Sequence, residues 1–222
     1  AFEEFRHSSR GLLLRDNVFG TMAEDAARRD LTVNALYYDP KSYSVIDHTG
    51  GLNDLSEAKI KVIGDPYTRF IEDPVRILRV IRFATKLNFK IASNTASAIP
   101  EISPFLTDIP PARLFDEFIK LFFSGNAKNI LRNIINHSLL DYFFPDLQSQ
   151  MENQIKWKNL INNACADTDL RMHQGKSVTP AFLLAAMLWP RVTAVANKNS
   201  NAGQDHFTAI QSAGAEVAAR SK

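Results

Sequence analysis

The sequence predicts an α+β fold that is mostly α-helical, in which a small head with a few β-strands precedes an all-helical body. Three observations lead to this prediction. Short alternating apolar stretches, typical of strands, occur only between residues 31 and 63. From residue 67 onward the apolar spacing is helical, and prolines separate the segments. The 222 residues are 45% hydrophobic and 23% charged, which indicates a globular chain with a buried core.

The head is expected to hold three strands and little helix. In chain order we predict a mobile arm (residues 1–20), a short helix (22–30), the two strands of a hairpin (31–38 and 43–47), a second short helix (52–57) and a third strand (59–63). We expect no further β-structure. A three-stranded sheet with so little helical cover is hard to stabilise, so the head is predicted to be incomplete.

Helices are expected to make up the rest of the chain. Their predicted ranges are 67–71, 74–88, 94–103, 111–124, 126–137, 151–165, 179–189 and 205–220. Residues 197–204 are predicted to form an exposed loop. These patterns divide the chain into a head at residues 1–65, a helical neck at 66–137 and a helical body at 138–222.

Charge and cysteine content narrow the class of protein. The net charge is only +2, but residues 58–90 carry eight Lys and Arg against three acids, which favours a polyanionic partner there. The single cysteine, Cys165, cannot form an internal disulfide. The longest apolar run, residues 182–189, is too short to cross a bilayer. We therefore expect a cytoplasmic monomer without a membrane segment.

A row of arginines on one predicted helix is the strongest sign of a binding site. Asp73-Pro74 is a typical helix start, because the carboxylate can cap free N–H groups and proline suits the first turn. Arg76, Arg79 and Arg82 follow at every third position among apolar residues. Guanidinium groups on so apolar a helix need anions nearby, either protein carboxylates or a phosphate-bearing ligand. We predict the ligand.

Asp73 and Arg76 together match one kind of nucleobase edge. A hydrogen-bond acceptor beside a donor complements the amino group and ring nitrogen that adenine and cytosine share. Guanine and uracil present a carbonyl and a ring N–H there, so both bonds would meet the wrong partner. The pair can thus select A and C over G and U, although helix capping alone would also explain Asp73.

The junction at residues 28–35 carries a second group of candidates. Arg29 could hold a triphosphate, since a guanidinium matches phosphate oxygens. Asp30 could bind a metal ion or a ribose, and Asn34 could bond a sugar hydroxyl. The alternative is that Asp30 only neutralises an arginine at a turn.

A third candidate is Arg113, in the first turn of a helix that begins after Pro110-Pro111. Its charge opposes the helix dipole, which favours another role for the side chain. An intramolecular partner such as Asp108 or Glu117 is the alternative.

Two further motifs are weaker. The run Asp47-His48-Thr49-Gly50-Gly51 has the glycines of a sharp turn, and a structural role is favoured over a site. Asp167-Thr168-Asp169 is a D-x-D, the type of pair that holds Mg²⁺ in phosphoryl transfer. We expect it in a loop between helices, with no strand beneath it and no Gly-Ser before it, and predict no metal role.

Four blocks stand in a fixed order along the chain: RRDLTVNAL at 28–36, DHTGG at 47–51, EDPVRILRVIRF at 72–83 and PPARLFDE at 110–117. The ordered set resembles the class II nucleotidyltransferases, the family of bacterial poly(A) polymerases and tRNA CCA-adding enzymes. The stretches LLLRDNVFG, IPPARLFDE and TPAFLLAAMLW are more similar to the poly(A) polymerase branch.

The resemblance implies part of a nucleotidyltransferase head, then a helical neck and body. It also implies a template-independent enzyme that adds AMP from ATP to an RNA 3′ end, using Mg²⁺. Asp30 would be the active-site acid, and the other site residues would contact the nucleotide: Arg29, Asn34, Asp73, Arg76, Arg79, Arg82 and Arg113.

One departure from the family limits this expectation. The family's catalytic centre is a Gly-Ser motif followed by a metal-binding D-x-D, and these 222 residues contain no Gly-Ser with a D-x-D after it. We expect them upstream of Ala1, and we expect this chain alone to have no polymerase activity and to hold no metal. Two alternatives are open: a CCA-adding enzyme that uses CTP and ATP, and a catalytically dead RNA-binding module.

Overall fold

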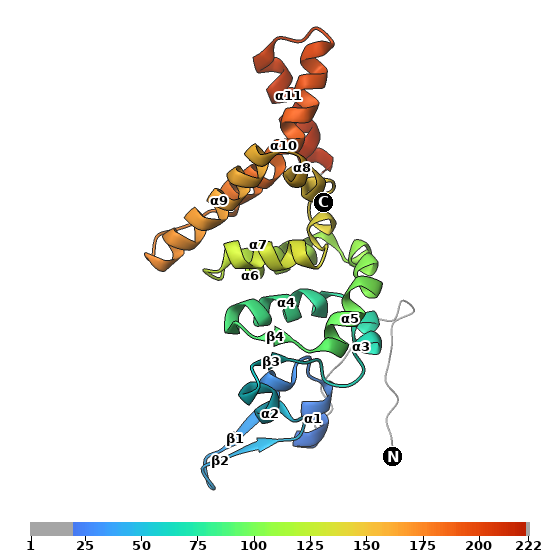
Figure 1. Ribbon diagram of the computed structural model, residues 1–222, viewed down its shortest axis with the longest axis vertical. Helices are drawn as coiled ribbons and strands as arrows, with labels where there is room; N and C mark the ends of the chain where they lie inside the picture. Colours follow the sequence, from blue (N-terminus) through green and yellow to red (C-terminus); the bar gives the residue numbers. More distant parts are fainter. Residues whose placement is uncertain (1–19, 221–222) are drawn as a thin grey trace.

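The computed structural model describes residues 20–220, and Figure 1 shows an elongated molecule whose elements follow one another along the long axis. The β-containing head lies at one end and helices α10 and α11 at the other. The predicted α+β class with mostly helical content is confirmed. The arm predicted at the N-terminus and the stretch LLLRDNVFG lie outside the described residues.

The head is built from short elements. They are α1 (Met22–Arg28), the 3-10 helix η1 (Thr32–Asn34), β1 (Leu36–Asp39), β2 (Ser44–Asp47), α2 (Gly51–Ser56) and β3 (Lys59–Ile60). Helix α1 begins at a capping box, in which the Thr21 hydroxyl and the Glu24 carboxylate satisfy each other's backbone N–H groups. Strands β1 and β2 pair in antiparallel register, so the predicted hairpin is confirmed.

The β-structure differs from the prediction in two places. Residues 32–34 form a 3-10 turn instead of a strand, and only Leu31 makes an isolated antiparallel bridge, to Val62. A fourth strand, β4 (Lys90–Ile91), pairs in parallel with β3. Two residues are too few to show an alternating pattern, and their partner is brought in by the intervening helices. This pairing is therefore a tertiary property.

The turn at η1 is fixed by the close approach of α2. A Cβ at Gly51 would lie 2.3 Å from the carbonyl oxygen of Thr32, so only glycine allows the two backbones to touch. Gly50 has a φ of +80°, which also favours glycine. The predicted structural role of this motif thus places η1, and with it Asn34.

The neck consists of helices packed around α4. Its elements are α3 (Pro66–Glu72), α4 (Val75–Leu87), α5 (Ser93–Ile102), η2 (Ser103–Asp108), α6 (Pro111–Phe122) and α7 (Ala127–Asn136). Helix α4 buries one apolar face: Val75, Ile77, Leu78, Val80, Ile81 and Ala84. Asp73 is extended, with φ −154° and ψ 94°, and it separates α3 from α4.

The body departs more from the prediction. It contains η3 (Leu140–Tyr142), α8 (Leu147–Asn153), α9 (Ile155–His173), α10 (Pro180–Asn201) and α11 (His206–Arg220). Helix α10 continues through Pro190, so the loop predicted at 197–204 is wrong over its first part. The distal half of α10 packs on α11 through a small apolar cluster: Val192, Ala196, Ala209, Ala213 and Val217. That packing stabilises a helix that the local sequence does not indicate.

A single apolar core joins the head, the neck and most of the body, from Leu31 to Met187. Within residues 20–220, none of the helices combines the length and apolar character that a membrane crossing requires.

Candidate nucleotide-binding site

A polar cleft of about 850 Å³ opens where the head meets the neck. Its three walls come from the end of α1 with η1, from the start of α4, and from α6. The lining residues are Arg28, Arg29, Asp30, Asn34, Asp73, Val75, Arg76, Arg79, Arg113, Asp116, Glu117 and Lys120. Six cations thus face four carboxylates, a balance that favours an anionic ligand with hydrogen-bonding groups.

The head wall presents Arg29 in a fixed position. Its Nε donates to Oδ2 of Asp25 at 3.0 Å and its Nη1 to the carbonyl oxygen of Asn34 at 3.1 Å. Its guanidinium lies 5.2 Å from the ring centroid of Tyr37. The Tyr37 hydroxyl, together with the Arg28 and Arg29 guanidiniums, holds the pKa of Asp25 well below its usual range. Asp25 therefore stays ionised and anchors Arg29.

Asp30 crosses the cleft to α4, where its carboxylate accepts a hydrogen bond from Nε of Arg79. The Asp30 side chain is only 12% exposed. Burial by itself would raise the pKa of Asp30, but the hydrogen bond and charge of Arg79 outweigh burial, and the pKa lies below its usual value. Asp30 is thus a buried, ionised carboxylate at the cleft edge.

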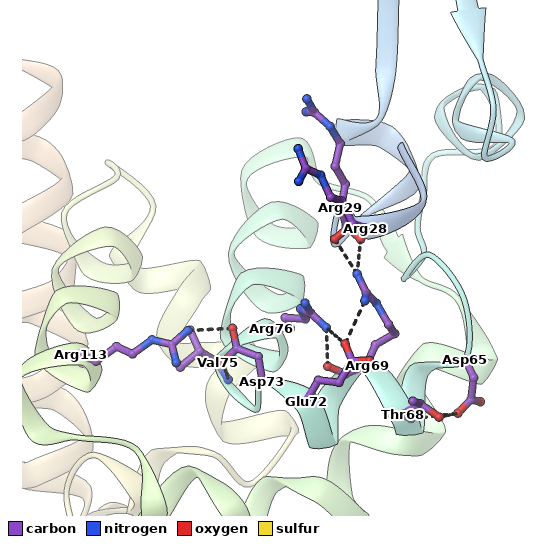
Figure 2. Close-up of polar contacts among 10 residues, drawn as sticks. All are labelled: Arg28, Arg29, Asp65, Thr68, Arg69, Glu72, Asp73, Val75, Arg76 and Arg113. Atoms are coloured by element: carbon purple, nitrogen blue, oxygen red, sulfur yellow. Dashed lines mark hydrogen bonds and ion pairs between the residues drawn. The ribbon is translucent and has the colours of Figure 1, made fainter. Parts of the chain in front are cut away.

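Asp73 is held from two sides, as Figure 2 shows. Its Oδ2 accepts from Nη2 of Arg113 at 2.7 Å and its Oδ1 from the N–H of Val75 at 3.3 Å. Arg113 thus has an intramolecular partner, as the alternative expected, but this partner is Asp73 and neither Asp108 nor Glu117. Asp73 can cap helix α4 and also contact a ligand, because each of its carboxylate oxygens has a further lone pair.

Arg76 leaves half of its guanidinium unused. Its Nη1 donates to Oε2 of Glu72 at 2.7 Å and to the carbonyl oxygen of Arg69 at 2.8 Å. Its Nε and Nη2 have no hydrogen-bond partner within the described part of the chain. The Arg76 side chain is 18% exposed. The pKa of Glu72 lies below its usual value, because Arg76 donates to the carboxylate and Arg69 adds positive charge.

Arg82 does not line the cleft, in contrast to the expectation. Three residues along an α-helix fall about 60° short of a full turn, so Arg82 lies roughly 120° around α4 from Arg76. Its guanidinium lies 5.1 Å from the ring centroid of Phe83 instead. The other seven predicted site residues line the cleft together.

Acidic and basic residues of α6 also line the cleft, although the sequence patterns did not predict them as site residues. Asp116, Glu117 and Lys120 face the cleft, and Nζ of Lys120 donates to Oε1 of Glu117 at 2.7 Å. The signal was present, because these residues follow Arg113 at the spacing of one helix face.

In the two weaker motifs, at residues 47–51 and 167–169, an aspartate accepts hydrogen bonds from main-chain N–H groups. The carboxylate of Asp47 accepts four main-chain N–H bonds, from residues 49–52, at 2.9 to 3.0 Å. The D-x-D lies inside α9, so its expected position in a loop is wrong. Asp169 accepts from the N–H groups of Ala127 at 2.6 Å and Lys128 at 3.0 Å, which caps α7.

Metal-binding chemistry does not fit the groups present. Over residues 20–220 no three His, Cys, Asp or Glu side chains are arranged to hold a metal ion. Asp30 is already paired with Arg79, and Glu117 is paired with Lys120. A two-metal site needs clustered carboxylates, which this cleft does not offer.

Comparisons with known proteins agree with these features. The model of the poly A polymerase head domain matches residues 3–61, and the model of a probable RNA- and SrmB-binding site of polymerase A matches residues 88–151. Poly(A) polymerase I of Salmonella typhi is 44% identical over 190 residues, which are 85% of this chain and 41% of that protein. The chain thus spans less than half the length of this relative.

Relatives from the other branch are more distant. A CCA-adding enzyme of Ligilactobacillus salivarius is 35% identical over 145 residues, which are 64% of this chain and 36% of that enzyme. A crystal structure of a tRNA nucleotidyltransferase complexed with a primer tRNA and an incoming ATP analog is similar, with a TM-score of 0.59 and 26% identity. The similarity covers 78% of this chain and 52% of that one. The chain therefore belongs to the nucleotidyltransferase family that comprises the bacterial poly(A) polymerases and the tRNA CCA-adding enzymes.

Proposed function

We propose that this chain is the nucleotide-selecting part of a poly(A) polymerase, which adds AMP from ATP to an RNA 3′ end. The observation that carries the proposal is the position of Asp73 and Arg76 on one wall of the cleft, with Arg29, Asp30 and Asn34 on another. One ligand could meet both groups. The 44% identity to a poly(A) polymerase I, against 35% to a CCA-adding enzyme, favours the poly(A) branch.

The neck wall reads the base. A free lone pair of Asp73 accepts from the adenine amino group, and the unpaired nitrogens of Arg76 donate to the adjacent ring nitrogen. Arg113 holds the Asp73 carboxylate in place. Because the acceptor and donor are fixed before the ligand arrives, guanine meets two mismatched groups.

The head wall binds the sugar and phosphates. Asp25 holds Nε and Nη2 of Arg29, and the Asn34 carbonyl holds Nη1, which leaves two of its five N–H groups for phosphate oxygens. Asn34 offers a side-chain amide to a ribose hydroxyl. Asp30 is placed to accept from a ribose hydroxyl while Arg79 keeps it ionised. In the complete enzyme Mg²⁺ would supply charge stabilisation for phosphoryl transfer, but the groups described here do not form its site.

Nucleotide binding by the purified 222-residue chain tests the assignment of the cleft. We expect ATP to bind more tightly than GTP, and the Arg76→Ala variant to lose about 1.5–3 kcal/mol of ATP binding, because a charged hydrogen bond is removed. Calorimetry with each nucleotide measures both quantities. Unchanged ATP-to-GTP preference in Arg76→Ala would remove Asp73 and Arg76 from base selection.

Primer extension tests the reaction. We expect the chain alone not to extend an RNA oligonucleotide with ATP and Mg²⁺, and a longer form with the Gly-Ser and D-x-D segment to add A residues. Extension by the 222-residue chain itself would contradict the assignment of its role.

A CCA-adding enzyme is the second candidate, favoured by one observation: the edge that Asp73 and Arg76 match is shared by adenine and cytosine. A tRNA without its 3′ end, offered with CTP, separates the two activities. Incorporation of C would assign the longer enzyme to that branch.

The remaining alternative is an RNA-binding module without activity. It predicts salt-sensitive RNA binding that neither ATP nor Asp73→Ala changes. We further propose that the protein acts as a monomer in the cytoplasm, where its one cysteine, buried Cys165, would stay reduced.

A further inference from the structure

We propose that Arg69 is a positioning residue that braces the sugar-phosphate wall of the cleft against the base-reading wall, which rests on the function proposed above. Arg69 lies in the last turn of α3 and does not line the cleft. Its contacts, drawn in Figure 2, reach both walls from behind.

The first half of the brace is the contact with the head. Nη2 of Arg69 donates to the carbonyl oxygens of Arg28 and Arg29, each at 2.7 Å. These carbonyls follow the end of α1, where backbone oxygens lack helical partners and carry the negative end of the helix dipole. One guanidinium therefore fixes the backbone that leads directly into Asp30.

The second half is the contact with the neck. Nη1 of Arg69 donates to Oε2 of Glu72 at 2.9 Å, and the same oxygen accepts from Nη1 of Arg76 at 2.7 Å. Arg76 also donates to the carbonyl oxygen of Arg69 at 2.8 Å. The side chains of Arg69, Glu72 and Arg76 and the main-chain carbonyl of Arg69 close a ring of bonds, so the orientation of the Arg76 guanidinium depends on where Arg69 and Glu72 lie.

Because the Arg69 guanidinium is largely buried, it would be costly in free energy to leave it without hydrogen-bond partners. The Arg69 side chain is 16% exposed, and its Nε is buried with no hydrogen-bond partner in the described part of the chain. All the compensation for burying this charge therefore comes from the two carbonyls and Glu72. Removal of the guanidinium would leave the two carbonyls and Glu72 without this cationic donor.

The other contacts between the cleft walls are of a different kind. The pairs Asp30–Arg79 and Asp73–Arg113 are formed by side chains that line the cleft and that a nucleotide would engage. The contacts of Arg69 lie behind the walls and remain when the cleft is filled. Arg69 can thus keep the spacing of the walls constant while the lining groups exchange partners.

Hydrogen exchange in the 222-residue chain tests the brace without any ligand. In Arg69→Gln we expect exchange to rise roughly tenfold on both sides of the cleft, at the amides of Arg29 and Asn34 and at that of Arg76. The Ile130 amide in α7 should keep its wild-type rate. Arg69→Lys, which retains donors for the carbonyls, should restore most of the protection at Arg29.

A matched control is Lys59→Gln, which removes a surface ion pair with Glu57 that shares no residue with the Arg69 contacts. It should change none of these amides. If Arg69→Gln changes the exchange rate only at the Arg76 amide, or at no amide, Arg69 does not brace the two walls.

Should Arg69→Gln raise exchange everywhere, Glu72→Gln decides the matter. It removes the charge from the acceptor and so weakens the ring, but it leaves the carbonyl contacts, so exchange should rise at Arg76 and not at Arg29. A uniform rise in Glu72→Gln as well would mean that these residues serve overall stability only.

A second arm measures ATP and GTP binding in the same variants. We expect Arg69→Gln to lower the ratio of ATP to GTP affinity roughly threefold to tenfold while Lys59→Gln leaves it unchanged. Wild-type chain that binds neither nucleotide would contradict the proposed function, whereas the exchange results would still decide the brace. A brace seen by exchange with an unchanged affinity ratio would show that Arg69 does not position the base-reading residues.

Discussion

Two pairs of aspartates in this molecule look alike in sequence and differ in their partners. Asp47 and Asp169 accept hydrogen bonds from main-chain N–H groups at the ends of helices α2 and α7. Asp30 and Asp73 accept from the side chains of Arg79 and Arg113 beside an open cleft, and Asp73 also accepts from the N–H of Val75.

The kind of donor distinguishes structural carboxylates from functional ones. A main-chain donor cannot leave without unfolding a helix end, so Asp47 and Asp169 are committed to the fold. Asp30 and Asp73 lie at the cleft with lone pairs beyond those that their arginines use, so both stay available to a ligand.

The largest effect is expected for Asp47→Ala. Four N–H groups would lose a charged acceptor, and we expect the free energy of unfolding to fall by about 2–4 kcal/mol. Urea denaturation followed by circular dichroism measures the loss. Asp47→Asn, which keeps one acceptor oxygen, should lose less, and an Asp47→Ala chain as stable as wild type would show that the motif is not structural.

Asp73→Asn should affect selectivity far more than stability. The amide keeps an acceptor for the Val75 N–H but can now donate to the guanine carbonyl, so we expect the ratio of ATP to GTP affinity to fall about tenfold. The free energy of unfolding should change by less than about 1 kcal/mol. Calorimetric titration and urea denaturation of the same sample check both numbers. A large stability loss with intact selectivity would place Asp73 with the structural pair.

Asp169→Ala tests the structural role of the D-x-D at residues 167–169. Removing the cap of α7 should lower the free energy of unfolding by about 1–2 kcal/mol. The matched control is Asp167→Ala, an exposed residue on the same helix, for which we expect a change within about 0.5 kcal/mol. Equal losses in the two variants would falsify the capping role.

The smallest effect concerns pH. Burial would raise the pKa of Asp47, but the N–H groups of Leu52, Thr49, Gly51 and Gly50 outweigh it, and the folded pKa lies below the usual value. A lowered folded pKa contributes stability above the unfolded pKa, and that stability is lost as the pH falls through the folded pKa. From about pH 5 to about pH 2, wild type should therefore lose more stability than Asp47→Ala. Parallel curves for the two proteins would contradict the pKa shift.

The site residues were predictable in kind but not in arrangement. The arginine row, Asp73 and the residues 29–34 follow from charge, spacing and the order of motifs, and seven of eight predicted side chains line one cleft. The failure at Arg82 has a simple cause, because a spacing of three residues drifts around the helix. The role of Arg69 could not be seen, since its partners are backbone carbonyls about forty positions away.

What the sequence by itself determined is local: the start of α4 at Asp73-Pro74, its apolar face, the turn at Gly50-Gly51 and the family to which the four motifs belong. Only the tertiary structure decided which charges meet. It paired Arg113 with Asp73 instead of Asp108 or Glu117, joined β3 to β4, and extended α10 through Pro190. The physical reason is that helix starts and turns depend on neighbouring residues, whereas ion pairs and short strands depend on distant segments that packing brings together.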